Sequence, residues 1–99
     1  MSNVMAFCTF KLKKGVNIAD FMLASDKVNN EIFSVQKGYI SRSVMVDGDV
    51  WGDYVLLDSM EAAERVSKAV MENPVAGEFM AFIDESTFNV HHFVVQKTY

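Results

Sequence analysis

The segment from Asp49 to Asp58 constrains the fold more than any other part of the sequence. It reads Asp-Val-Trp-Gly-Asp-Tyr-Val-Leu-Leu-Asp and runs directly into Ser-Met-Glu-Ala-Ala-Glu-Arg. Its β-branched and aromatic residues favour a strand, whereas Asp58 or Ser59 followed by Glu61 is typical of a helix N-terminus. A strand that leads straight into a helix is therefore predicted in the second half of the chain.

A similar strand-to-helix step occupies the first half. From Val4 to Leu12 every even position is apolar or a thiol, which predicts a strand with one buried face that ends at Lys14-Gly15. Asn17 is predicted to cap a helix, because apolar residues then recur at helical spacing as far as Ile32. Gly38 is expected to stop this helix as its C′ residue.

A hairpin is predicted between the two halves. Tyr39 to Val46 alternates again, and Asp47-Gly48 is a strong signal for a two-residue turn. That turn pairs Val46 with Asp49, Val44 with Trp51 and Arg42 with Asp53. Opposite charges that face each other contribute roughly 0.2–1 kcal/mol. A four-residue loop would change the partners and keep the faces, whereas a three-residue loop would reverse the faces.

The rest of the chain completes a single domain of residues 1–99. The second helix, from Met60 to Asn73, should be interrupted at Pro74, because proline cannot continue the helical hydrogen bonds. Apolar residues then predict a short extra helix before Asp84, and Ser86 to Gln96 is predicted as the last strand. The order β-α-β-β-α-β with short connections favours an α+β fold of the ferredoxin-like type. Its four-stranded antiparallel sheet carries both main helices on one face.

The composition indicates that this fold needs a partner. Apolar residues make up 51% of the 99 residues, and the mean hydropathy of +0.12 is high for so small a soluble monomer. The second face of the predicted sheet carries aromatic, valine and histidine side chains rather than uniform charge. Covering this face with a second copy removes apolar surface from water. A homodimer is therefore predicted.

Charge and motifs exclude several classes of function. The net charge is −4, and no basic cluster is larger than Lys11, Lys13 and Lys14, so no nucleic-acid partner is expected. The single Cys8 suits a reducing compartment, and neither a signal peptide nor an apolar run of about 18 residues is present. A soluble, cytoplasmic protein without a membrane partner is expected. The sequence has no glycine-rich phosphate loop and no metal-ligand spacing, so we expect no cofactor and no metal site.

Trp51 and Asp53 are the first candidates for chemistry, because they share one face of their strand. A tryptophan can stack on a flat substrate, and an aspartate can accept a proton or orient a phenol. The structural alternative is that Trp51 packs in a dimer core and that Asp53 neutralises Arg42. Both interpretations stay open at the level of sequence.

His91 and His92 are the second candidates. As neighbours on a strand they point to opposite faces, so they cannot bind one metal ion together. One faces the helices and the other faces the open side of the sheet. We prefer His91 as the pocket histidine and general base, because it shares its face with Asn89 and Thr87. A purely structural histidine is the alternative.

A polar stripe of Tyr39, Ser41 and Ser43 is expected to face Tyr54 on the neighbouring strand. Two phenols and two hydroxyls in one place can bind a polar aromatic compound, although they can equally be ordinary surface hydroxyls. Cys8 lies on an apolar face with no cue for a lowered pKa, so it is not predicted to be catalytic.

The sequence resembles the antibiotic-biosynthesis monooxygenase-like family of dimeric α+β barrels over nearly its whole length. The segments that carry the resemblance are Gly38-Tyr39, Asp47 to Asp53, Leu57 to Ala63, Glu72-Asn73-Pro74, Phe79 to Asp84 and His92-Phe93. The resemblance implies that two protomers pack their sheets face to face. It also implies a pocket between each sheet and its helices or the partner subunit.

For function, the resemblance implies several activities. Some members oxidise polycyclic phenols with molecular oxygen and no metal or flavin, and others degrade haem through a histidine on the second helix, which this chain lacks. We therefore predict a cofactor-independent monooxygenase-like enzyme for a small aromatic or flat apolar compound. The alternatives are a non-catalytic small-molecule-binding homodimer and haem binding through His91 or His92. The residues assigned to the enzyme are His91 or Asp53 as base, with Trp51, Phe7, Tyr39, Tyr54 and Asn89 against the substrate.

Overall fold

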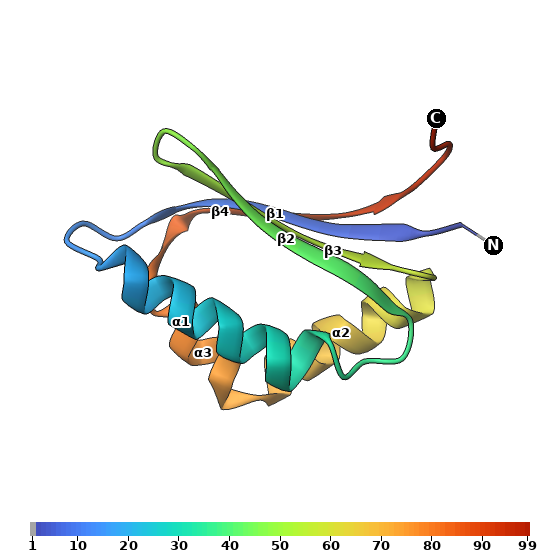
Figure 1. Ribbon diagram of the computed structural model, residues 1–99, viewed down its shortest axis with the longest axis horizontal. Helices are drawn as coiled ribbons and strands as arrows, with labels where there is room; N and C mark the ends of the chain where they lie inside the picture. Colours follow the sequence, from blue (N-terminus) through green and yellow to red (C-terminus); the bar gives the residue numbers. More distant parts are fainter. Residues whose placement is uncertain (1) are drawn as a thin grey trace.

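The structure, a computed structural model that describes residues 2–99, is a four-stranded antiparallel sheet with its helices on one face (Figure 1). The sheet order is β2-β3-β1-β4, as in ferredoxin-like α+β folds, so the predicted fold class is confirmed. The last strand begins three residues earlier and ends two residues earlier than predicted. The elements in chain order are β1 (Val4–Leu12), α1 (Ile18–Val28), the π-helical η1 (Asn29–Phe33), β2 (Tyr39–Asp47), β3 (Val50–Leu57), α2 (Met60–Glu72), α3 (Pro74–Met80) and β4 (Ile83–Val94).

The alternation in β1 determines which side chains face the helices. Val4 and Phe10 at its even positions are buried, as predicted. Their neighbours across the sheet are Leu57 and Trp51 on β3, so the alternate residues of β3 share this face. The odd positions of β1 point to the opposite side, which no element of residues 2–99 covers in Figure 1.

In the hairpin between β2 and β3, the turn lies one residue later in the sequence than predicted. Its two-residue loop is Gly48-Asp49, so Asp47 pairs with Val50 and Val44 pairs with Asp53. Gly48 has φ +62°, and among the described residues no side-chain-bearing residue has a positive φ. Glycine adopts a positive φ without steric strain, so it suits the first central position of the observed turn. The predicted turn would have needed a positive φ at Asp47 as well. The faces of both strands are those predicted.

Side-chain caps start the helices where the sequence indicates. The Asn17 Oδ1 atom accepts a hydrogen bond from the Asp20 amide at 3.1 Å, and the Ser59 Oγ atom accepts one from the Ala62 amide at 3.1 Å. Asn73 ends α2, and its side chain caps α3, with Pro74 at the first position of that helix. Each cap satisfies a backbone donor that the helix itself cannot bond.

The prediction that Gly38 stops the first helix as its C′ residue is wrong. The helical segment ends at Phe33 after the π-helical turn, which a further turn separates from β2. Gly38 has φ +93°, and a Cβ atom there would lie 2.8 Å from the Ala62 Cβ atom and against the Asp58 carboxylate. Glycine is therefore needed where β2 begins, because the start of α2 packs directly against its backbone.

The core between sheet and helices consists of two clusters rather than one. The first centres on aromatic residues, with Phe10, Phe21 and Phe79 in mutual contact at ring-centroid distances of 5.1–6.3 Å. The second contains smaller residues of α2 and its strands, such as Ala63 and Leu57. Small side chains at the junction leave space that is not filled by the chain itself. No helix of residues 2–99 is long and apolar enough to cross a membrane.

Candidate functional site

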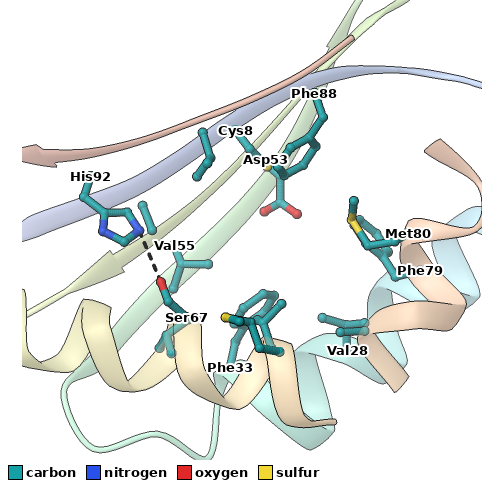
Figure 2. A pocket seen from close by; sticks show the side chains of 16 residues that line it. Cys8, Val28, Phe33, Asp53, Val55, Ser67, Phe79, Met80, Phe88 and His92 are labelled. Atoms are coloured by element: carbon teal, nitrogen blue, oxygen red, sulfur yellow. Dashed lines mark hydrogen bonds between the residues drawn. The ribbon is translucent and has the colours of Figure 1, made fainter. Parts of the chain in front are cut away.

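A pocket of about 250 Å³ lies between the sheet and the helices, where the two core clusters meet (Figure 2). Its volume exceeds the roughly 150 Å³ of a cavity that holds benzene, and it is below the roughly 300 Å³ at which pockets for drug-sized ligands begin. The pocket therefore has the size for a compound of one or two rings. Its apolar wall includes Val28, Phe33, Val55, Val66, Phe79 and Phe88, and its polar groups are Cys8, Asp53, Ser67 and His92.

Asp53 on β3 forms a buried ion pair with Arg42 on β2. Arg42 Nε donates to Asp53 Oδ1 at 3.0 Å, and Nη2 donates to Oδ2 at 2.8 Å. The guanidinium therefore binds the carboxylate in a bidentate, fork-like geometry. Only 5% and 6% of the two side chains are exposed. The prediction that Asp53 neutralises Arg42 is confirmed. The predicted register is wrong, because Val44 lies opposite Asp53 and Arg42 is its diagonal neighbour.

The surroundings of Arg42 hold this pair in one geometry. Its Nη1 atom donates to the Ser25 carbonyl oxygen on α1 at 3.0 Å. Its guanidinium carbon lies 5.0 Å from the centroid of the Phe33 ring and 5.7 Å from that of Phe79, which are cation–π distances. Arg42 therefore joins the edge of the sheet to α1 while it presents the Asp53 carboxylate to the pocket.

Cys8 is the direct cross-strand neighbour of Asp53 and lines the same pocket. Burial, followed by the negative charge of Asp53, raises the pKa of the Cys8 thiol from 9.0 to about 12, and the positive charge of Arg42 offsets only part of this rise. The nucleophilic form of cysteine is the thiolate. Cys8 is therefore a neutral wall of the pocket at physiological pH and not a nucleophile.

His92 is the histidine that lines the pocket, so the preference for His91 as the pocket residue is wrong. On β4, His92 pairs with Ala6 and shares the face of the sheet that the helices cover. Its Nε2 atom lies 3.4 Å from the Ser67 Oγ atom on α2, and this contact is drawn in Figure 2. Ser67 was not identified from the sequence, because only the packing of α2 against β4 brings the two residues together.

His91 lies on the open face, away from Asp53. Its ring stacks on Phe93 with centroids 5.1 Å apart, and Phe93 meets Phe7 edge to face at 6.4 Å. Asn89 pairs with Thr9 on the same face. The two histidines point to opposite sides, as predicted, and no group of three or more metal-ligating side chains occurs in residues 2–99. The candidates His91, Phe7 and Asn89 are thus brought together, but not with Asp53.

The two tyrosines of the predicted polar stripe are separated by a β-bulge. Ser43 Oγ donates to Tyr54 OH at 3.1 Å on the open face, so the expected proximity of these two residues is confirmed. The pairing of β2 with β3 shifts between Tyr39 and Ser41, which turns Tyr39 to the helix side beside Leu57. A bulge adds one residue and reverses the alternation beyond it. The predicted pocket with both phenols is therefore not formed.

Trp51 shares its face with Asp53, as predicted, but it does not line the pocket. Its ring packs edge to face on Phe21 with centroids 5.1 Å apart, in the aromatic cluster of its own chain. Trp51 therefore belongs to the core of its own chain. Of the residues assigned to the substrate site from the sequence, only Asp53 lies in this pocket.

No family model and no curated protein sequence matches this chain. Among solved structures it is similar to a variant of SnoaB, a cofactor-independent oxygenase from Streptomyces nogalater, with a TM-score of 0.82 and 15% identity over 99% of this chain and 97% of that one. It is also similar to a protein of Bordetella bronchiseptica provisionally named an antibiotic biosynthesis monooxygenase, with a TM-score of 0.79 and 13% identity over 100% of both chains.

A third similar structure is a protein of Caulobacter crescentus that carries the same provisional name, with a TM-score of 0.78 and 10% identity over 97% of this chain and 92% of that one. The chain therefore has the fold of the antibiotic-biosynthesis monooxygenase-like proteins. The resemblance seen in the sequence is confirmed at this level. One fold supports many activities, so the function has to be argued from the pocket.

Proposed function

We propose that this chain is a monooxygenase-like enzyme that needs no cofactor and acts on a small, flat, largely apolar compound in the pocket between sheet and helices. The observation that carries the proposal is His92, a proton acceptor at the mouth of a pocket whose other walls are mainly apolar. The similarity of the fold to a protein described as a cofactor-independent oxygenase supports it.

The pocket suits a reaction in which the substrate itself is made reactive. Imidazole can remove a proton from an acidic O–H or C–H group near neutral pH. An apolar wall keeps water from solvating the resulting anion, so the anion remains a strong electron donor. Asp53 is less suited to the role of base, because both of its oxygens already accept hydrogen bonds from Arg42.

Such an anion can reduce molecular oxygen without an external reductant. When a methylene group becomes a carbonyl group, the substrate loses four electrons and dioxygen accepts them. One oxygen atom enters the product, and the other leaves as water with the two protons of the methylene group. The chain would supply binding, desolvation and the proton acceptor, with Ser67 holding the ring of His92 in position.

Oxygen uptake with labelled dioxygen tests the proposal. A panel of one- and two-ring phenols with an activated methylene group is incubated with the protein, and mass spectrometry detects incorporation of labelled oxygen. Turnover should fall about 10²- to 10⁴-fold in His92→Ala, the range for loss of a general base. His91→Ala is the matched control, since it removes the neighbouring imidazole from the open face, and should keep its turnover.

Two results separate the remaining interpretations. If the panel compounds bind but no labelled oxygen is incorporated, the pocket belongs to a non-catalytic binding protein. If turnover survives in His92→Ala, the assignment of the proton acceptor is wrong. In that case the same measurement on His91→Ala asks whether the open face carries the chemistry.

We also propose that two copies pair through the open faces of their sheets. Phe93, Met45 and Val50 on this face are 51%, 40% and 41% exposed, and Phe7 lies beside them. A stable interface buries about 800 Å² on each partner, and these side chains would contribute apolar surface to it. Native mass spectrometry should detect a dimer, and a monomer at micromolar concentration would contradict the proposal.

A further inference from the structure

We infer that the Asp53 carboxylate, fixed by Arg42, selects neutral ligands that carry a hydrogen-bond donor at their inner end. This inference rests on the proposed function, because it assumes that the pocket holds a ligand. It adds a specificity-determining residue and a chemical class: a flat compound with one hydroxyl group for Asp53 and a second hydroxyl group toward His92.

The hydrogen bonds of Asp53 leave part of its carboxylate free for a ligand. An ionised carboxylate has about four acceptor positions, and the Arg42 fork uses one on each oxygen. Figure 2 shows the carboxylate projecting from the sheet into the pocket. Asp53 thus lines the pocket and keeps acceptor positions that Arg42 does not use.

The charge of the pair determines which ligand suits it. Arg42 neutralises Asp53, so the pair as a whole gives a cation little advantage over a neutral donor. An ionised carboxylate can only accept hydrogen bonds, so a ligand carboxylate or carbonyl oxygen placed there would find no donor on Asp53. A phenolic hydroxyl fits both conditions.

The sheet register sets the distance between the two ends of the site. Asp53, Cys8 and Val90 form one row across β3, β1 and β4, and His92 lies in the next row, opposite Ala6. Two strand spacings of about 4.8 Å and a rise of about 6.8 Å for two residues put the Cα atoms of Asp53 and His92 roughly 12 Å apart. Two fused rings with a hydroxyl group at each end can bridge the side chains across this gap.

Calorimetric binding of four matched compounds tests this inference. They are naphthalene, a naphthol, a naphthalenediol with hydroxyl groups at opposite ends, and the hydroxynaphthoic acid in which one hydroxyl is replaced by a carboxylate. A hydrogen bond to a charged acceptor should make the diol bind about 10- to 100-fold more tightly than naphthalene. The hydroxynaphthoic acid should bind more weakly than the diol.

The informative variant is Arg42→Met combined with Asp53→Leu. Replacing both partners of a buried ion pair with apolar residues of similar size often preserves stability, whereas Asp53→Asn alone leaves a buried, poorly paired arginine. The double variant should bind naphthalene at least as well and lose the preference for the diol. Circular dichroism and thermal unfolding check that it is folded, and His91→Ala serves as the control that keeps the preference.

The outcomes separate this inference from the proposed function. Equal binding of naphthalene and the diol, or a diol preference that survives in the double variant, overturns the role of Asp53. Either result leaves the pocket as a ligand-binding site. No binding of any compound overturns both. Diol selectivity without incorporation of labelled oxygen into any of the methylene-bearing phenols supports the role of Asp53 and rejects the oxygenase.

Discussion

The two faces of the sheet place the same kinds of residue in different surroundings. On the helix side, the polar groups are paired and placed around a pocket, as with Arg42 and Asp53. On the open side, aromatic rings such as Phe7 and Phe93 meet edge to face with no element of residues 2–99 above them. The helix side therefore has the features of a binding site, whereas the open side has those of an interface. His91 and His92 show that one step along a strand decides between these roles.

The largest effect on stability is expected from breaking the buried pair on the helix side. Asp53→Ala leaves Arg42 charged and buried without its carboxylate, which should lower the free energy of unfolding by about 3–5 kcal/mol. Urea denaturation measures this change. Asp49→Ala is the matched control, since it removes the exposed Lys11–Asp49 pair at 3.4 Å and should cost about 1 kcal/mol or less. Equal losses in the two variants would contradict the difference between buried and exposed pairs.

A charged side chain introduced on the open face should weaken the proposed dimer. Phe93→Glu puts a carboxylate in the proposed interface twice, because a two-fold interface repeats each contact, and should raise the dimer dissociation constant about 10³-fold. Leu23→Glu is the control: Leu23 is 66% exposed on α1, away from the open face. Analytical ultracentrifugation compares the two. A dimer that tolerates Phe93→Glu and dissociates with Leu23→Glu would move the interface to the helices.

A smaller, pH-dependent effect is expected from Cys8 on the helix side. In the unfolded chain the thiol loses its proton near pH 9.0, but in the folded protein its pKa is about 12. Between these values the unfolded state binds fewer protons, so the free energy of unfolding falls as the pH rises. Cys8→Ala lacks this contribution. The difference in unfolding free energy between the natural protein and the variant should therefore decrease from pH 9 to pH 12, and a constant difference would show that the thiol is not buried beside a negative charge.

Most of the fold follows from local features of the sequence. The alternation from Val4 to Leu12, the caps at Asn17 and Ser59, and the break at Pro74 each act over a few residues, so a sequence pattern reports them directly. The error at Gly38 has a different origin. The sequence predicts a helix end at Gly38, but its positive φ where β2 begins and the close approach of α2 are what require glycine there.

The site was less predictable, because it depends on contacts between distant segments. Neither the bulge that turns Tyr39 to the helix side nor the packing of Ser67 near His92 leaves a local pattern. The choice between the histidines had a usable signal, since Val90 continues the helix-side alternation to His92. The prediction favours His91 instead, because its neighbours on the same face are polar.

The histidine side chains offer the most direct test of the account, because the chain has only two of them and they lie on opposite faces. NMR spectra of the imidazole carbons, assigned with His91→Ala and His92→Ala, are recorded while the naphthalenediol is added. The account predicts that the signals of His92 shift with ligand concentration and that those of His91 stay in place. Shifts of His91 alone would contradict it, because the ligand would then bind at the open face.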